Sequence, residues 1–270
     1  MTISIYDGRR IIFPIDGAAD PADMVKQAIS LFSHEDALPW VGMIKLNDGV
    51  HIPGMGPDII AYLREAVPGH VGFFLDLKIF DVSATMANTL KRYAEYEPEI
   101  VTVCSKVIVK GLLAIRETLP NTKIAIVDTL TDMPERECRS RYGTIPAIQI
   151  ANAIIGLEKE LRLVSEASPI DLIVCSANDL SYLRERFGAR YGFVCPGIRD
   201  EWMFKGGNED HQRRVAGTCE ALRNGATYIV MGTQLTKGNP KAGISPEESR
   251  GWTWAEMKRY SDEREVKNEF

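Results

Sequence analysis

One stretch of the chain combines a buried apolar run with charged residues, namely residues 71–85, which read VGFFLDLKIFDVSAT. The apolar part predicts a buried strand, and side chains two residues apart on a strand project from the same face. Asp76 and Lys78 therefore share a face, and Asp81 follows in the turn after the strand. Burying an unpaired carboxylate or ammonium group is costly, so charges at the end of a core strand indicate a functional site.

The spacing D-x-K-x-x-D could also arise by chance, without any functional role. Taken alone it is a weak signal, because most chance copies would form the solvated face of a helix. Here the charges are embedded between the apolar segments Gly72–Leu75 and Ile79-Phe80. A solvated face is therefore disfavoured, and a functional role is favoured.

The composition is that of a soluble globular protein. The chain has 270 residues, of which 45% are hydrophobic and 26% charged, and its formal net charge is -5. It has no basic block, which argues against nucleic-acid binding as the main function but leaves room for a local basic pocket.

Cysteine usage and hydropathy point to the cytoplasm. The five cysteines are odd in number and form no C-x-x-C motif, and the histidines lack metal-ligand spacing. We therefore expect neither a disulfide framework nor a metal site. The N-terminus lacks the apolar region of a signal peptide, and no apolar run approaches about 18 residues, so we expect no membrane segment.

Eight apolar runs recur along the chain, and each is continuous rather than alternating. Continuous runs are typical of strands that are covered on both faces, hence of a parallel sheet. The predicted strands are Ile11–Asp16, Val41–Leu46, Val71–Leu77, Ile100–Cys104, Lys123–Asp128, Asp171–Ser176, Tyr191–Pro196 and Thr227–Gly232.

Helical patterns separate these runs. The predicted helices are Pro21–Phe32, Pro57–Val67, Ala84–Tyr96, Lys106–Leu119, Ile145–Ser165, Asp179–Phe187, Asp210–Asn224 and Pro246–Tyr260. Eight strands alternate with eight helices over about 250 residues. This pattern predicts an α/β fold, the (β/α)8 TIM barrel. A doubly wound open sheet is the alternative, but it usually has fewer strands. Because the sequence shows no linker, we expect one domain over residues 1–270, with a short charged C-terminal tail from about residue 262.

The barrel prediction places a site, because TIM-barrel active sites lie at the C-terminal ends of the strands. Polar residues occur at or just after the ends of several predicted strands. They are Asp16, Lys45, Asp76, Lys78 and the segments Asp128–Asp132, Cys195–Arg199 and Gly232–Gln234. We therefore expect these residues to gather at one mouth of the barrel.

In this order, the residues resemble the orotidine 5'-phosphate decarboxylase suprafamily from about Arg10 to Ser249. Residues 73–85 match the family's D-x-K-x-x-D signature and the Thr after it, although Ser83 stands where Pro, Ala or Gly is usual. Asp16 matches the strand-1 Asp. Lys45 matches the lysine of the decarboxylase branch, where sugar-phosphate branches typically carry Glu. The segments CPGIR (195–199), QRR (212–214) and GATYIVMG (225–232) resemble the phosphate-binding end.

Two positions depart from the family pattern. The family normally has Arg after the strand-8 Gly, where it binds the 5'-phosphate, but this chain has Thr233. A bidentate charge-assisted contact is lost, and Arg199, Lys237 or backbone N–H groups are candidates to replace it. The family's Ser that reads the pyrimidine amide corresponds to Asp132, and an ionised carboxylate accepts hydrogen bonds but cannot donate them.

The resemblance implies cofactor-independent decarboxylation of orotidine 5'-phosphate to UMP in de novo pyrimidine biosynthesis, or of a close orotate nucleotide or nucleoside. Asp76 would lie against the substrate carboxylate, a repulsion relieved as carbon dioxide leaves. Lys78 would stabilise and protonate the ring carbanion, and Lys45 and Asp16 would hold ribose hydroxyls and orient that lysine. The implied catalytic residues are Lys45, Asp76, Lys78 and Asp81. The implied substrate-binding residues are Asp16, Thr85, Thr131, Asp132, Pro196, Gly197, Arg199, Gln212, Gly232 and Thr233.

The resemblance also implies a homodimer, because the family's Asp at position 81 crosses into the partner's site, where Thr85 would join it. Two other functions stay open. One is a sugar-phosphate decarboxylase or aldolase with Mg²⁺, against which Lys45 argues and which metal dependence would reveal. The other is a non-catalytic nucleotide-binding protein, motivated by Thr233 and Asp132, although an unused buried charge array would be costly.

Overall fold

The structure is a computed structural model that describes residues 9–33, 37, 39–51, 55–206 and 216–268. Its parallel strands pair in sequence order, and β8 pairs with β1, which closes a barrel. The strands are β1 (Ile11–Ile15), β2 (Val41–Leu46), β3 (Gly72–Ile79), β4 (Ile100–Cys104), β5 (Lys123–Val127), β6 (Ile170–Val174), β7 (Gly192–Pro196) and β8 (Tyr228–Val230). The prediction of a (β/α)8 TIM barrel is confirmed.

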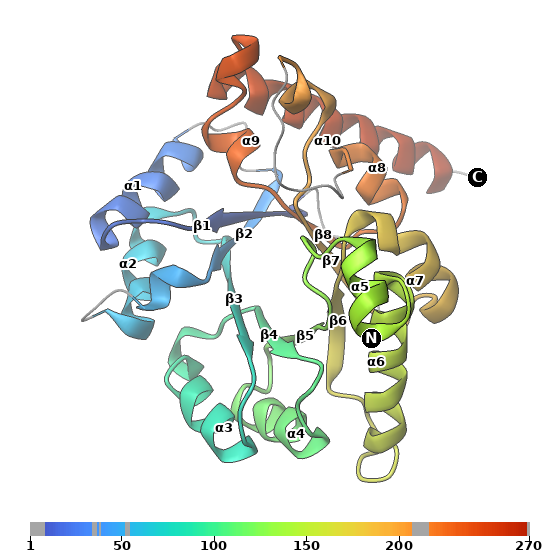
Figure 1. The fold of residues 1–270 in the computed structure, drawn as a ribbon. Helices are drawn as coiled ribbons and strands as arrows, with labels where there is room; N and C mark the ends of the chain where they lie inside the picture. The colour runs from blue at the N-terminus through green and yellow to red at the C-terminus, as the bar shows by residue number, and fades with distance from the viewer. Residues whose placement is uncertain (1–8, 34–36, 38, 52–54, 207–215, 269–270) are drawn as a thin grey trace.

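Helices surround the strands (Figure 1). They are α1 (Pro21–Phe32), α2 (Ile59–Ala66), α3 (Ser83–Lys91), α4 (Val109–Thr118), α5 (Glu135–Tyr142), α6 (Pro146–Leu161), α7 (Leu180–Phe187), α8 (Thr218–Arg223), α9 (Thr233–Thr236) and α10 (Pro246–Asn268). Helix α1 begins as its sequence indicates: Pro21 occupies the first turn, and the Asp20 side chain accepts from the Asp23 N–H at 2.8 Å. In the part of the chain that the structure describes, no helix is long and apolar enough to cross a membrane.

Several predicted helices differ from those observed. Residues 94–96 form a separate 3-10 turn, so the predicted helix Ala84–Tyr96 ends earlier, at Lys91. The predicted helix Asp210–Asn224 is α8, which starts only at Thr218, and residues 207–215 lie outside the described part. Helix α10 continues to Asn268, through most of the charged residues that we expected to form a tail.

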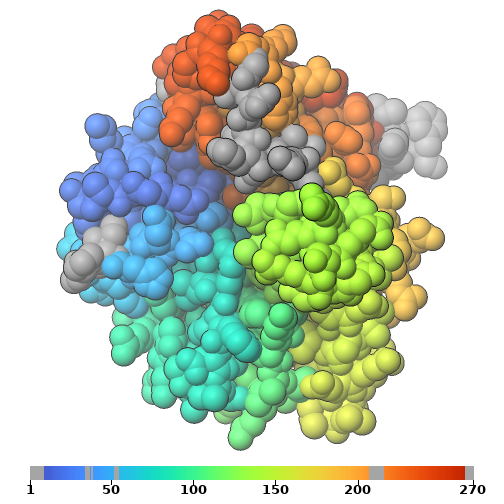
Figure 2. All heavy atoms as spheres, in the orientation of Figure 1, coloured from blue at the N-terminus to red at the C-terminus, as the bar shows by residue number. Residues whose placement is uncertain are grey.

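Two helices were not predicted. Helix α5 buries only Cys138, and five of its eight residues are charged, so it lacks the apolar periodicity that identifies a helix. Ion pairs one helical turn apart support it, with Arg139 Nη2 at 2.8 Å from Glu135 Oε1. In Figure 2 the green segment that contains α5 forms a lobe on the viewed face. Helix α9 is a single turn, too short for a periodic pattern.

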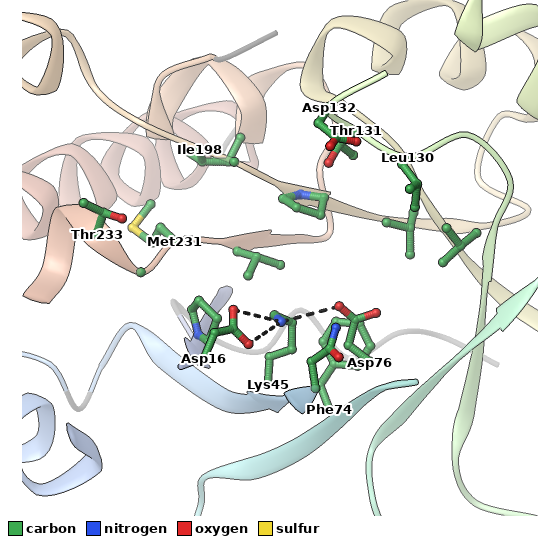
Figure 3. Close-up of a pocket in the computed structure, with 18 of the residues that line it drawn as sticks. Asp16, Lys45, Phe74, Asp76, Leu130, Thr131, Asp132, Ile198, Met231 and Thr233 are labelled. Atoms are coloured by element: carbon green, nitrogen blue, oxygen red, sulfur yellow. Dashed lines mark hydrogen bonds and ion pairs between the residues drawn. The ribbon is translucent and has the colours of Figure 1, made fainter. Parts of the chain in front are cut away.

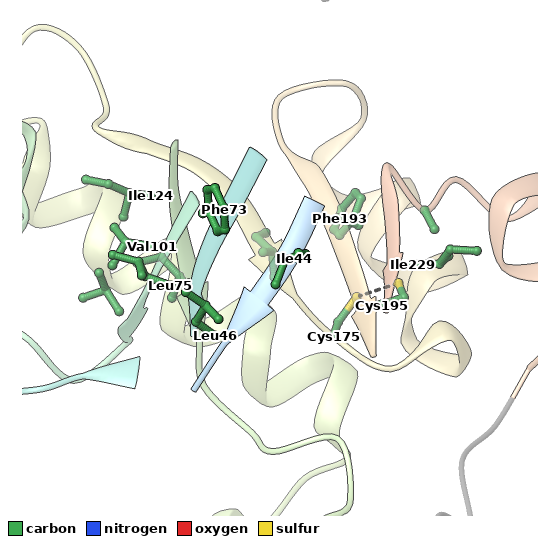
Figure 4. Packing of buried hydrophobic residues seen from close by; sticks show 14 of the residues in the cluster. Ile44, Leu46, Phe73, Leu75, Val101, Ile124, Cys175, Phe193, Cys195 and Ile229 are labelled. Atoms are coloured by element: carbon green, nitrogen blue, oxygen red, sulfur yellow. Dashed lines mark hydrogen bonds between the residues drawn. The ribbon is translucent and has the colours of Figure 1, made fainter. Parts of the chain in front are cut away.

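The strands divide the core into two layers because successive side chains point to opposite faces. Phe73 and Leu75 of β3 belong to the larger cluster, which packs against the helices, and Figure 4 shows them beside Ile44 and Val101. Phe74 belongs to a separate cluster inside the barrel, together with side chains such as Met43 of β2. The interior is therefore a packed core, and any site must lie above it at a barrel mouth.

The register determines which polar side chains reach that mouth. Met43 and Phe74 face the barrel interior, so Lys45 and Asp76, each two residues further along its strand, face the same way. The same alternation carries Ile12 of β1 to Asp16 just after the strand. Polar residues placed at the strand ends by the sequence thus converge above the apolar interior.

Candidate active site

A cavity of about 440 Å³ lies at the C-terminal ends of the strands (Figure 3). Most of the side chains predicted for the site line it, namely Asp16, Lys45, Asp76, Lys78, Thr131, Asp132, Pro196, Gly197, Arg199, Gly232 and Thr233. Asp81 and Thr85 are exposed and are not among the described lining residues. Gln212 falls within 207–215, outside the described residues.

Four charged side chains form one continuous array across this cavity. Lys45 Nζ lies 3.1 Å from Asp16 Oδ1 and 3.4 Å from Asp76 Oδ2, and Lys78 Nζ lies 2.8 Å from Asp76 Oδ1. Figure 3 shows Asp16, Lys45 and Asp76 side by side along one wall. The charges alternate in sign, so each carboxylate has an ammonium partner within hydrogen-bond or ion-pair distance.

Burial differs along the array. The side chains of Lys45 and Asp76 are 10% and 14% exposed, whereas those of Lys78 and Asp16 are 37% and 51% exposed. Burial by itself would raise the pKa of Asp76, but the charge of Lys45 and the hydrogen bonds from Lys78 and Thr102 outweigh it and lower that pKa. Asp76 is therefore an ionised carboxylate held between two cations at neutral pH.

The end of β3 departs from a regular ladder at the residues that carry these charges. Leu75 pairs with Val101 and Ile79 with Val103, so the bulge Asp76–Lys78 stands opposite the single residue Thr102. Lys78 has a φ of 46°, a left-handed backbone conformation that is strained for a side chain of this kind. The bulge lets Asp76 and Lys78 bring their charged atoms together.

Thr102 holds this bulge, and the sequence reading missed it. Its hydroxyl accepts from the Lys78 N–H at 2.8 Å and lies 3.0 Å from Asp76 Oδ1, to which it can donate. Thr102 is fully buried, so its hydroxyl needs such partners. The available signal was one hydroxyl inside the apolar run Ile100–Cys104, but Thr is also common in strands, so the signal is weak.

The opposite walls of the cavity come from the segments after β5, β7 and β8. Thr131 and Asp132 lie across the cavity from the charged array, and Thr233 lies beside Met231 at one side, as Figure 3 shows. Arg199 also lines the cavity, and partial burial lowers its pKa. Among the described lining residues, Lys45, Lys78 and Arg199 are the cations. Their positive charges would attract an anionic ligand into the cavity.

The array is made of lysine–carboxylate pairs rather than of metal ligands. In the described ranges, no three His, Cys, Asp or Glu side chains gather closely enough to hold a metal ion. Asp16 and Asp76 lie on either side of Lys45 Nζ. The arrangement can place a carboxylate and an ammonium group against the same small molecule, which suits charge stabilisation and proton transfer.

Comparison with known proteins identifies the family of this chain. Residues 8–244 match the Orotidine 5'-phosphate decarboxylase / HUMPS family. An orotidine 5'-phosphate decarboxylase of Synechococcus sp. (strain CC9605) is 29% identical over 254 residues, which cover 90% of this chain and 96% of that one. One from Staphylococcus aureus (strain bovine RF122 / ET3-1) is 30% identical over 188 residues, covering 68% and 76%.

Solved structures show the same fold. The crystal structure of orotidine 5'-phosphate decarboxylase from Lactobacillus acidophilus superposes with a TM-score of 0.64 at 19% identity, covering 92% of this chain and 99% of the other. That from Pyrococcus horikoshii OT3 gives a TM-score of 0.60 at 21% identity, with the same coverage. With the barrel, the array at its mouth and the match over most of the sequence, this chain belongs to the orotidine 5'-phosphate decarboxylase / HUMPS family.

Proposed function

We propose that this protein decarboxylates orotidine 5'-phosphate to UMP, without a cofactor, as a carboxy-lyase of de novo pyrimidine biosynthesis. The observation that carries the proposal is the array in which Asp76 lies between Lys45 and Lys78 at the barrel mouth. The family match and the relatives named orotidine 5'-phosphate decarboxylase support it. A close orotate nucleotide or nucleoside is the alternative substrate, because Thr233 lines the end that we assign to the phosphate.

The array has the charges that this chemistry needs. A substrate carboxylate next to Asp76 is repelled by an ionised group, and that repulsion is relieved as carbon dioxide leaves. The electron pair that remains on the ring carbon is stabilised by Lys78, whose ammonium group then delivers a proton to it. Lys45 is held by Asp16 at 3.1 Å and keeps Asp76 ionised through its charge. Lys45 and Asp16 also bind the ribose hydroxyls.

The test is the loss of orotate absorbance when purified protein is added to orotidine 5'-phosphate, with and without a metal chelator. Turnover that the chelator leaves unchanged is the expected result. Turnover that needs Mg²⁺ would favour a sugar-phosphate type of lyase, for which metal-bound carboxylates are typical. Binding of UMP without any turnover, for orotidine as well as its phosphate, would contradict the proposal and favour a nucleotide-binding protein.

We further propose that the protein is a cytoplasmic homodimer in which Asp81 and Thr85 complete the neighbouring subunit's site. Both residues are exposed, and the apolar side chains of Phe80 and Val82, the chain neighbours of Asp81, are 62% and 66% exposed. Large apolar side chains grouped at a surface favour a protein interface there.

A complementation experiment tests this dimer. The variants Lys78→Ala and Asp81→Ala should each be nearly inactive alone, because each removes a catalytic residue from both sites of a homodimer. Mixed subunits should recover activity, because one of the two sites in each mixed dimer then has both residues intact. A monomer by sedimentation, or no recovery on mixing under conditions of subunit exchange, would contradict the shared site.

A further inference from the structure

Three arginines converge near the N-terminal ends of β7, β8 and β1, at the end of the barrel opposite the cavity. Arg10 immediately precedes β1, and its Nη1 donates to Ala226 O at 3.4 Å, just before β8. Arg184 on α7 donates from Nη2 to the preceding carbonyl, Gly225 O, at 2.7 Å. These two guanidinium groups are therefore bound to consecutive carbonyls of the chain, which brings their positive charges close together.

A tyrosine on α10 brings the third arginine to the same place. The guanidinium carbon of Arg10 lies 5.6 Å from the centre of the Tyr260 ring, and that of Arg264 lies 5.9 Å from it. Arg264 follows Tyr260 by about one helical turn on α10. A cation–π contact holds a guanidinium group against a ring without neutralising its charge. We call Arg10, Arg184 and Arg264 together the arginine cluster.

The positive charge of the arginine cluster is not balanced by carboxylates of the described residues. Elsewhere in the described ranges arginines pair with acidic side chains, as Arg139 does with Glu135 at 2.8 Å. No carboxylate that the structure describes lies within ion-pair distance of the three arginines of the cluster. Burial lowers the pKa of Arg10, and the charges of Arg264 and Arg184 lower it further. The cluster is therefore a local excess of positive charge.

The cluster is held in place and is also open to solvent. Arg184 Nη1 donates to Gly188 O at 3.0 Å, and the guanidinium carbon of Arg184 lies 4.8 Å from the centre of the Phe193 ring. The three arginine side chains and the tyrosine ring between them are half-buried. A ligand can reach such groups from solvent, and guanidinium groups that are already oriented lower the entropy cost of binding it.

We propose that the arginine cluster is a second binding site, which takes a phosphate or diphosphate group of a small molecule at the end of the barrel opposite the active site. Three cations at one place favour a multiply charged oxyanion over a single carboxylate, because guanidinium groups match its geometry with paired hydrogen bonds. A guanidinium has more N–H donors than the carbonyls take here from Arg10 and Arg184, so donors remain for a ligand.

A purely structural role accounts for only part of the cluster. Arg184 ties the end of α7 to the loop before β8 through its two carbonyl contacts. Such a tie gives no reason to gather two further arginines beside it, because like charges repel each other. The site is also separate from the proposed decarboxylation, since the charged array of Asp76 and Lys78 lies at the C-terminal ends of the strands.

An NMR titration of the full chain with inorganic pyrophosphate tests the site, because backbone amide signals report the two ends of the barrel separately. The amides of Ala226 and Tyr260 lie at the arginine cluster. Those of Thr131 and Gly232 lie at the cavity. A dissociation constant can therefore be obtained for each end, and any pyrophosphate that enters the cavity is not mistaken for binding at the cluster.

The variants change one charge at a time. Arg264→Gln and Arg10→Gln each remove one positive charge from the cluster, and Arg264→Lys keeps the charge but loses the planar fork. Arg139→Gln is the matched control, because Arg139 is an exposed arginine that pairs with Glu135 on α5 and contacts none of the cluster. Circular dichroism checks that each variant is folded.

In the wild type, pyrophosphate should shift the Ala226 and Tyr260 signals until they saturate. In Arg264→Gln and Arg10→Gln, we expect the dissociation constant from these signals to rise by about tenfold or more, the loss typical of one charge-assisted hydrogen bond. Arg264→Lys should lie between these variants and the wild type. The Arg139→Gln control should stay within about twofold of the wild type.

These readouts separate the inference from the proposed function. Saturable shifts at the cluster that weaken only in the cluster variants support the inference, whether or not the protein turns over orotidine 5'-phosphate. Pyrophosphate that moves only the cavity signals of Thr131 and Gly232 would overturn it. So would an equal weakening in Arg139→Gln and in the folded cluster variants, because the overall charge of the protein would then explain the binding.

Discussion

The main-chain N–H of Lys78 donates to the hydroxyl of Thr102 at 2.8 Å, and that hydroxyl lies 3.0 Å from Asp76 Oδ1. One buried side chain on β4 thus contacts both residues that we propose for the chemistry on β3. It does so where β3 bulges and where Lys78 adopts a positive φ of 46°. Strained backbone at a site persists only if its surroundings hold it, and Thr102 provides that support.

Replacing Thr102 by Val should therefore impair both stability and catalysis. Val has nearly the same shape but leaves the Lys78 N–H and Asp76 Oδ1 without this partner. We expect the free energy of unfolding to fall by about 1–3 kcal/mol. We expect kcat to fall about 10- to 100-fold as the array loses its alignment. Urea unfolding and steady-state kinetics measure the two effects. Thr102→Ser, which keeps the hydroxyl, should remain close to wild type in kcat; equal losses in both variants would contradict the role of the hydroxyl.

Lys78→Ala should remove most of the activity while the fold persists. Without the ammonium group, the carbanion lacks both its stabilising charge and its proton donor, so we expect kcat to fall at least about 100-fold. The matched control is Lys91→Ala, because Lys91 is an exposed lysine in the last turn of α3. Circular dichroism should show both variants folded. A fully active Lys78→Ala variant would refute the assignment.

Arg199 and Thr233 offer a rescue experiment. Arg199→Ala should raise KM for orotidine 5'-phosphate by about tenfold or more, because the phosphate loses a charge-assisted contact. Adding Thr233→Arg to that variant should recover part of the loss, because it restores a guanidinium on the neighbouring wall of the same cavity. Thr233→Arg alone should change KM little if Arg199 already binds the phosphate. A large fall in KM from Thr233→Arg alone would show that the wild-type phosphate contact is weak.

The lowered pKa of Asp76 makes a prediction about acid stability. Because the folded-state pKa lies below the unfolded value of about 3.9, ionised Asp76 contributes stability that is fully present above that value. The contribution is lost as the pH falls through the folded-state pKa. In urea unfolding across this range, the stability difference between wild type and Asp76→Asn should grow as the pH rises and level off above about pH 5. A difference that does not vary with pH would contradict the shift.

Parts of the fold could not be read from the sequence, for identifiable physical reasons. Helix α5 is stabilised by side-chain ion pairs on a charged surface, and such helices carry little apolar periodicity. The bulge at Asp76–Lys78 depends on Thr102, which is 24 residues away in the chain. The pair Asp200–Gln234 is separated by 34 residues, and neither residue has a local signal of its partner.

The sequence by itself determined a parallel sheet covered on both faces, because its apolar runs are continuous and alternate with helical segments. The number of these runs, eight, favoured a closed barrel over an open sheet, and the strands do close into one. It also determined which charged residues meet at the mouth, because alternation along a strand fixes the face that Lys45 and Asp76 occupy. Only the tertiary structure decided how these charges pair, how Thr102 supports them and how Gln234 hydrogen-bonds to Asp200. These are contacts between distant segments, and their geometry depends on the closure of the barrel rather than on any local pattern of residues.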